Sequence, residues 1–317
     1  MLLEAIVLAL GAAPALARAA APGSPSPPDP STRPNVVFVL ADDLGWADLG
    51  SYGQQKIRTP AIDRLAAEGV RFTQHYSGNA VCAPSRSVLL TGQHPGHTPI
   101  RDNRELQPEG QVPLPGAAVT LAELFKTLGY ATGAMGKWGL GPPGSEGDPL
   151  RQGFDRFFGY NCQRHAHDYY PAYLYDDSRR LSLDEPGKVY APDLIWERAR
   201  AFIRENEGRP FFLYLPTTIP HLALQVPDDS LAEYRGLWPD PPYDGGKGYR
   251  PHPSPRAAYA AMVTRMDREV GRILDLLRER GLDEGRSSSS PRTTARPTTA
   301  SAARTRSSSA RPAPSGG

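Results

Sequence analysis

The sequence predicts an α/β fold, with a mostly parallel sheet and helices on both of its faces. Three observations indicate this fold. Short apolar runs rich in Val, Phe and Leu alternate with amphipathic helical patterns along the chain. The runs are typical of strands buried on both faces, and a helical segment between two runs provides the crossover that parallel strands require. The 317 residues, of which 39% are hydrophobic, can bury a sizeable core.

Residues typical of helix ends indicate where the predicted elements begin and end. Thr59 and Pro60 are typical of an N-cap followed by the first helical position. Gly69, Gly129 and Gly208 each follow a helical pattern that a glycine can end. In chain order we expect a strand at 35–41, a helix at 61–68, an extended segment at 70–76, a helix at 85–90, a helix at 120–128, a strand at 131–135, a helix at 193–207, a strand at 210–215 and a helix at 256–280.

The two ends of the chain differ from its body in composition. Residues 5–17 form an apolar run that closes in Ala-x-Ala patterns, which predicts a signal peptide over 1–19 and a secreted or periplasmic protein. Glu4 stands where such a signal usually carries positive charge. Residues 20–34 are rich in Pro and Ser, which indicates an extended linker. Residues 286–317 contain six Arg, no acidic residue and no large apolar residue, so we expect a disordered basic tail.

Charge and cysteine content exclude several classes of protein. The net charge of +2 divides into +6 on this tail and −4 on residues 1–285, so the body is mildly acidic. We therefore expect no nucleic-acid partner, although the tail alone could be a nucleic-acid or membrane arm rather than a tail without a role. No integral membrane span is expected, because the apolar run is short. Two cysteines are too few for a disulfide scaffold.

Two carboxylates follow the first predicted strand directly. Ligands of parallel sheets bind beyond the carboxyl ends of the strands, which is where Asp42 and Asp43 lie in the sequence. Adjacent carboxylates at such an end could bind one hard cation. An Asp-Asp pair after a strand is, by itself, also typical of a turn or a helix cap.

The segment at 82–92 carries the most specific pattern in the chain. Its residues Cys-Ala-Pro-Ser-Arg-Ser-Val-Leu-Leu-Thr-Gly begin with Cys82 at the start of a helix, near free backbone N–H groups. Arg86 lies one helical turn further on. A buried free cysteine beside an unrelated helix is the alternative. The segment resembles the sulfatase signature C-x-P-S-R-x-x-x-L-T-G at every fixed position, and the resemblance runs from about residue 34 to residue 284.

The resemblance implies a sulfuric ester hydrolase of the arylsulfatase type, in the alkaline phosphatase superfamily, with an incomplete catalytic domain at 35–285. In this family a maturation enzyme oxidises the cysteine, here Cys82, to formylglycine. One hydroxyl of its hydrate attacks the ester sulfur, and the other helps to expel sulfate. By the same resemblance Asp42 and Asp43, with the modified residue 82, bind Ca²⁺ or Mg²⁺, and Arg86 holds the hydrate. Lys137 contacts sulfate, and His221 binds sulfate and acts as the acid.

The first departure from the family pattern is at Gly139. Many sulfatases carry Gly-Lys-Trp-His, and here the histidine position is a glycine, which cannot act as a base. The stretch 162–170 is dense in histidines and aromatics. Our hypothesis is that His167, or with less support His165, takes the missing role. The two histidines could instead form a metal pair or lie exposed in a loop.

The second departure follows the helix at 256–280. Sulfatases return to the sheet there with a strand that ends in Asp-Asn-Gly and completes the metal site, and a later lysine contacts sulfate. No Asp-Asn and no Lys follow Glu284, where the composition changes as it does after a reading-frame shift. We expect too few oxygen ligands for a calcium ion, an unpaired sheet edge, and an unstable, weakly active or inactive chain.

Other functions stay open at this stage. The family resemblance also allows a phosphonate or phosphate monoester hydrolase, or a catalytically dead anion-binding remnant. The substrate would be a small-molecule or glycan sulfate ester whose alcohol the sequence does not identify. Four tyrosines could stack on a sugar or aryl ring, although aromatic residues in a loop more often pack against the protein; they are Tyr169, Tyr170, Tyr173 and Tyr175. No disulfide is expected at Cys162.

Overall fold

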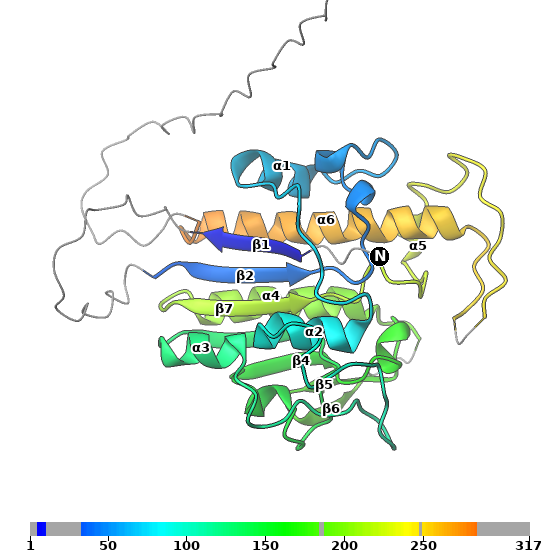
Figure 1. Cartoon of the computed structure of the whole chain (residues 1–317). Coiled ribbons are helices and arrows are strands. Elements are labelled where there is room, and N and C mark those ends of the chain that lie inside the picture. Colours follow the sequence, from blue (N-terminus) through cyan, green and yellow to red (C-terminus); the bar gives the residue numbers. More distant parts are fainter. Residues whose placement is uncertain (1–4, 11–32, 184–186, 247–248, 284–317) are drawn as a thin grey trace, which may run out of the picture. The chain divides into compact units, whose positions relative to one another are not determined.

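A computed structural model describes residues 5–10, 33–183, 187–246 and 249–283, all within one compact unit of residues 1–287. Seven strands of this described part form one sheet in the order β1-β2-β7-β3-β4-β5-β6 (Figure 1). The four central strands are parallel, and the strands at both edges are antiparallel to their neighbours. The strands are β1 (Ala5–Leu10), β2 (Asn35–Leu40), β3 (Ala131–Lys137), β4 (Arg156–Tyr160), β5 (Tyr173–Asp176), β6 (Arg179–Ser182) and β7 (Phe211–Pro216).

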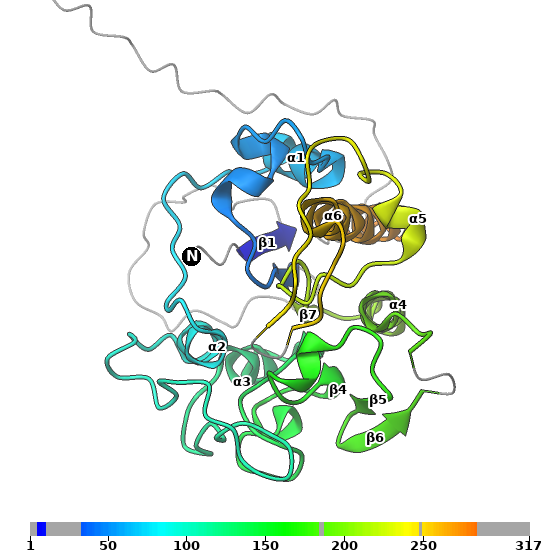
Figure 2. The same cartoon turned by 90° about the vertical axis from the view of Figure 1, so that its right-hand side faces the viewer.

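Helices cover both faces of the sheet, as the sequence predicts. Figure 2 shows α2 and α3 on one side and α4 and α6 on the other. Successive residues of β2 point to opposite faces, so that Val37 and Val39 join one apolar cluster while Phe38 and Leu40 join the other. The helices are α1 (Pro60–Glu68), α2 (Cys82–Thr91), α3 (Leu121–Thr127), α4 (Ala191–Glu205), α5 (Asp228–Leu231) and α6 (Pro255–Glu279).

Most predicted elements are confirmed to within a few residues, because their ends have local causes. Thr120 caps α3 by accepting a hydrogen bond from the backbone N–H of Glu123, whose carboxylate accepts one from Thr120 N in return. Gly92 ends α2 with a φ of +66°, the left-handed conformation that favours glycine. Strands β4, β5 and β6 were not predicted. The extended segment predicted at 70–76 is wrong as a strand, since these residues are exposed and join no ladder.

The edge of the sheet beside β2 differs from the expectation. The sequence predicted an unpaired edge somewhere in the sheet, and at this edge β1 pairs antiparallel with β2 over its whole length, from Ala5 opposite Leu40 to Leu10 opposite Asn35. An apolar segment of extended backbone satisfies the free N–H and C=O groups that an edge strand presents. The structure therefore uses Ala5–Leu10 as a strand, while the signal peptide over 1–19 stays a prediction about processing.

The remaining terminal predictions lie outside the described residues. They are the linker, of which 20–32 is not described, and the basic tail at 286–317. Among the helices of the described part, none combines the length and the apolar character needed to cross a membrane.

Candidate active site

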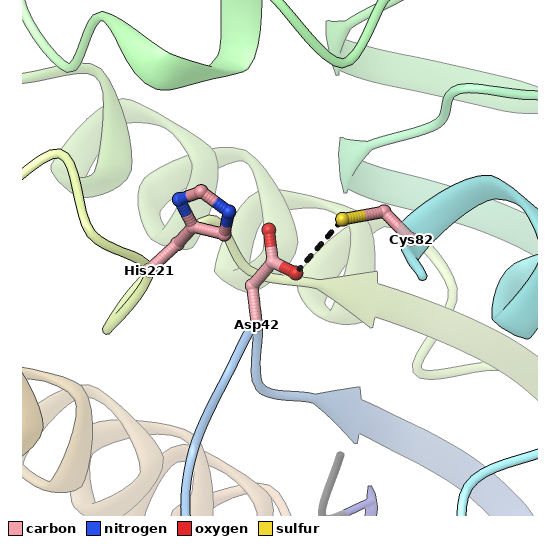
Figure 3. Close-up of side chains that lie close together, drawn as sticks. All are labelled: Asp42, Cys82 and His221. Carbon is pink, nitrogen blue, oxygen red and sulfur yellow. Dashed lines mark hydrogen bonds between the residues drawn. The ribbon is translucent and has the colours of Figure 1, made fainter. Parts of the chain in front are cut away.

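The site lies at the carboxyl ends of the three central strands β2, β3 and β7. Asp42 follows β2, Lys137 is the last residue of β3, and His221 follows β7. Cys82 reaches the same place from the first turn of α2. Figure 3 shows the side chains of Asp42, Cys82 and His221 pointing toward one another, and their potential ligand atoms lie within 4.8 Å of each other. The parallel register of the three strands brings these side chains together.

Asp42 is an enclosed carboxylate that contacts both cationic side chains of the site. Lys137 Nζ donates a hydrogen bond of 2.7 Å to Asp42 Oδ2, and Arg86 Nη2 lies 3.5 Å from Asp42 Oδ1. All three side chains are essentially inaccessible to solvent. Burial by itself raises the pKa of Asp42, but the positive charges of Lys137 and Arg86 outweigh it and lower the pKa to about 2. Asp42 is therefore a carboxylate at neutral pH.

Cys82 is half-buried and close to this charged group. Its Sγ lies 3.6 Å from Lys137 Nζ and 4.0 Å from Asp42 Oδ1. The next residue, Ala83, donates its backbone N–H to Asn103 Oδ1 at 2.8 Å, which fixes the first turn of the helix. A nucleophile placed here has the Nζ atom of Lys137 beside it.

Arg86 links the helix to the strand end. Its Nη1 donates a hydrogen bond of 2.6 Å to the carbonyl oxygen of Lys137. Burial lowers the pKa of the guanidinium, but the negative charge of Asp42 more than compensates and the pKa lies above its ordinary value. Arg86 therefore stays charged. Together with Lys137 Nζ, which lies 3.6 Å from Cys82 Sγ, it makes this corner attractive to an anion.

Asp43 and His221 form the outer part of the site. Asp43 has a φ of +64°, which turns its side chain away from Asp42, and its Oδ2 lies 3.3 Å from His221 Nε2. Burial, followed by the negative charge of Asp42, raises the pKa of Asp43 to about 6. Burial and then the positive charge of Lys137 lower the pKa of His221 to about 4. Without a ligand, His221 is thus a neutral imidazole at pH 7.

The structure separates the two candidate histidines. Both lie in the short 3-10 turn η5 (His165–His167), but only His167 faces the site, where its ring stacks on His221 with centroids 4.5 Å apart. His165 instead stacks on Tyr173 at 4.2 Å, and its Nδ1 lies 3.5 Å from Glu109 Oε1. Burial and the charge of Lys137 lower the pKa of His167 to about 3, so this imidazole is neutral. The two histidines do not form a metal pair.

The aromatic residues of this loop mainly pack. Tyr169 is fully buried, and its hydroxyl donates to the carbonyl oxygens of Thr218 and His221 at 2.6 and 3.1 Å. Tyr169 therefore positions the loop that carries His221. Tyr249 was not among the residues selected in the sequence analysis. Its ring centroid lies 5.3 Å from that of His167 and 5.9 Å from that of His221.

The residues present are suited to hold a divalent cation. Asp42 is ionised, and the Oδ1 atom of Asp43 is buried with no hydrogen-bond partner in the described structure. An orphaned carboxylate oxygen beside a second carboxylate is the type of ligand that Ca²⁺ and Mg²⁺ prefer. His221, which was predicted as an acid, joins Asp42 and Cys82 in the group of potential ligands, whereas Asp43 lies outside that group.

Comparisons with known proteins agree with this geometry. The sulfatase family model matches residues 34–285. An arylsulfatase of Hemicentrotus pulcherrimus is 37% identical over 231 residues, which cover 67% of this chain and 42% of the relative. The N-acetylgalactosamine-6-sulfatase of Canis lupus familiaris is 32% identical over 285 residues, covering 83% of this chain and 49% of the relative. The chain thus spans about half the length of these curated relatives.

Among solved structures, the fold is similar to that of Ps i-CgsB. The TM-score is 0.67 at 28% identity, and the match covers 79% of this chain and 56% of the other. The same protein has been solved in complex with k-i-k-neocarrahexaose, with a TM-score of 0.66.

Proposed function

The chain belongs to the sulfatase family, and we propose that it carries the sulfate-ester hydrolysis site of a longer enzyme. The observation that carries the proposal is the position of Cys82. Its sulfur lies at the opening of α2, 3.6 Å from a fully buried lysine and beside a fully buried arginine. Two desolvated cations at one nucleophile are suited to an anionic group that must be bound and attacked there.

The nucleophile would be formylglycine, produced from Cys82 by a sulfatase-maturing enzyme. The hydrate of this aldehyde supplies a hydroxyl that attacks the ester sulfur and a second hydroxyl that assists release. Lys137 would contact the sulfate oxygens and compensate the charge that develops on them, and Arg86 would hold the hydrate. Both side chains are held by Asp42 and by the backbone, so they need little reorganisation when the substrate binds.

Proton transfer would involve the two stacked histidines. We propose His221 as the donor to the leaving alcohol and His167 as the acceptor that compensates for Gly139. The pKa of His221 is about 4 without ligand, and a bound anionic sulfate ester would raise this pKa because negative charge favours the imidazolium. His167 is already neutral, the state in which an imidazole accepts a proton.

Asp42, Asp43 and residue 82 would hold Ca²⁺ or Mg²⁺, which would help to neutralise the sulfate group. Calcium takes about six to eight oxygen ligands. The described residues supply about three or four of them, so water would have to complete the shell. We therefore propose weak metal binding and weak activity for the chain of this sequence.

The substrate would be a sulfated glycan or a small aryl sulfate ester. Two relatives are named arylsulfatase and N-acetylgalactosamine-6-sulfatase, and Ps i-CgsB has been solved in complex with k-i-k-neocarrahexaose, which supports both possibilities. The apolar N-terminal run supports a secreted or periplasmic location.

The test is to produce the protein together with a formylglycine-generating enzyme and to map the peptide that contains residue 82. We expect an aldehyde at this position, and nitrophenyl sulfate turnover that Cys82→Ala removes. Nitrophenyl phosphonate serves as the competing substrate, and faster turnover of the phosphonate would reassign the reaction. An unconverted thiol would remove the nucleophile and with it the proposal.

A further inference from the structure

Gln163 has a buried carboxamide that the site residues named so far do not explain. The residue is 3% exposed, and neither its Oε1 nor its Nε2 has a hydrogen-bond partner among the described residues. Burying a carboxamide without partners costs free energy, because both of its polar atoms lose their water. An unpaired buried carboxamide of this kind is suited to form hydrogen bonds with a ligand that enters the site.

The carboxamide occupies the volume of the side chain that is missing at position 139. A Cβ atom added to Gly139 would overlap with Gln163 Nε2, and the φ of Gly139 is +74°. Gly139 lies two residues after Lys137, whose ammonium group lies next to Cys82. Gln163 therefore extends from its own loop toward the place where the family pattern carries a histidine.

A chain of hydrogen bonds connects Gln163 to the start of α2. The backbone N–H of Gln163 donates to Gln111 Oε1 at 2.8 Å. Gln111 Nε2 donates to the carbonyl oxygens of Asn103 and Arg104, both at 3.1 Å. Asn103 in turn accepts the N–H of Ala83, the neighbour of Cys82. The backbone of Gln163 is thus fixed relative to residue 82, while its side-chain donor and acceptor stay unpaired.

We propose that the Gln163 carboxamide binds a hydroxyl group of the hydrated aldehyde at position 82, and this proposal rests on the proposed function. A hydroxyl both donates and accepts, so one hydroxyl can pair with an amide whose donor and acceptor are both unpaired. A sulfate oxygen only accepts and would leave Oε1 unpaired. A metal ion would use Oε1 and leave Nε2 unpaired.

The chemistry assigned to Gln163 is positioning. Hydration adds one water across the aldehyde C=O, so that one C–O bond forms and the carbonyl oxygen becomes the second hydroxyl, with no change of oxidation state. A carboxamide cannot take the proton from this hydroxyl, which leaves proton transfer to His167. Gln163 would stabilise the hydrate relative to the free aldehyde.

The experiment measures hydration without turnover. Methoxyamine forms an oxime only with the free aldehyde, so the rate of oxime formation on matured protein reports how much of residue 82 is unhydrated. We expect Gln163→Ala to react about three- to tenfold faster than wild type, as the loss of one or two hydrogen bonds predicts. Gln163→Asn keeps the amide on a shorter side chain, so its rate of oxime formation should lie between those of wild type and Gln163→Ala.

The matched control is Gln152→Ala. Gln152 is also fully buried, but its Nε2 donates to the carbonyl oxygens of Pro115 and Glu146, outside the site. A merely structural role predicts a lower melting temperature for both variants and equal oxime rates. If Gln163→Ala and wild type form the oxime at the same rate, the proposal is wrong. Gln163 would then bind a buried water or a substrate hydroxyl instead of the hydrate.

A double variant tests the shared volume. Gly139→His alone should lower the melting temperature strongly, because the new side chain meets Gln163, and Gln163→Ala in the same chain should restore part of the loss, while the strain of a side chain at a φ of +74° remains. A double variant no more stable than Gly139→His would contradict the geometry. Peptide mapping of wild type separates this proposal from the proposed function. An aldehyde at position 82 together with equal oxime rates in wild type and Gln163→Ala would contradict only the role of Gln163. An unconverted thiol would contradict that role and the proposed function.

Discussion

The site has two halves that are built in different ways. The strand-end half consists of Asp42, Lys137 and Arg86, whose charges are buried and paired with one another. The loop half comes from residues 161–167 and contains buried polar atoms without partners, including Asn161 Oδ1, Gln163 Oε1 and His167 Nε2. In the first half the charges are already held in ion pairs, although Arg86 Nε and Nη2 also lack a hydrogen-bond partner in the described structure. In the second half the unpartnered atoms belong to uncharged amide and imidazole groups, which a ligand or water could use.

The difference follows from how each half is held. Asp42 and Lys137 extend directly from a parallel ladder in which β7 pairs with both β2 and β3, so the sheet register fixes their separation. Arg86 joins them from α2 through its hydrogen bond to the carbonyl oxygen of Lys137. The loop residues follow β4 and depend on the path of a short 3-10 turn. The strand-end half should therefore contribute to stability as well as to catalysis, whereas substitutions in the loop half should lower turnover with less loss of stability. Each of the following experiments tests that division.

The largest stability effect should come from Lys137→Met. The substitution leaves Asp42 as a buried carboxylate with a weaker set of partners, and we expect a loss of about 3–5 kcal/mol in the free energy of unfolding. Chemical denaturation measures this loss. The control is Lys126→Met, which removes an exposed pair with Asp155 and should cost about 1 kcal/mol or less. Equal losses in the two variants would show that the strand-end half does not carry special stability.

The largest catalytic effect within the loop half should come from His167→Ala. Removing a proton acceptor lowers turnover by about 100-fold or more. His165→Ala, a change in the same 3-10 turn, should leave turnover near wild type because His165 contacts Glu109 and Tyr173 instead. Nitrophenyl sulfate hydrolysis by the matured protein distinguishes the two. Similar losses in both variants would assign no catalytic role to His167.

Calcium should stabilise the protein through Asp42 and Asp43. At a calcium concentration tenfold above its Kd, the free energy of unfolding should rise by about 1.4 kcal/mol. Asp43→Asn should weaken this rise, since the orphaned Oδ1 atom is the free ligand of the pair. Thermal unfolding at increasing calcium measures the effect, with Asp63→Asn as a carboxylate control outside the site. A rise that survives Asp43→Asn unchanged would place the ion elsewhere.

Much of the fold was predictable because its causes are local. Helix α3 has a capping box at Thr120, α2 ends at Gly92, and β2 is an apolar run with both faces buried. Strands β5 and β6 were missed because each is only four residues long and β6 is mostly polar, and they pair through a turn at Asp177 with a φ of +56°. The pairing partner of a short polar strand is set by its neighbours in space, which a single sequence does not contain.

The site divides in the same way. Cys82, Lys137 and His221 could be selected because their segments resemble the sulfatase pattern, and each also follows a predicted strand or begins a predicted helix. His165 and His167 could not be separated, since two residues in one turn point to different sides according to the backbone path. Gln163 gave no signal at all, because its burial and its unpaired amide arise only when the loop folds against Gly139.

The smallest expected effect concerns pH and again separates the halves. The pKa of His167 is about 3 in the folded protein and about 6.5 in the unfolded chain. Between these values the unfolded state binds more protons, so the contribution of His167 to stability is present above pH 6.5 and is lost as the pH falls toward 3.

His167→Phe keeps the aromatic stack without titrating. Between pH 7 and pH 5 the free energy of unfolding of wild type should fall by about 1 kcal/mol more than that of the variant, a value reduced for the partial exposure of the ring. Asp43, with a raised pKa, acts in the opposite direction but is common to both proteins. Parallel curves from denaturation at several pH values would mean that His167 is not held as a neutral, desolvated imidazole beside Lys137.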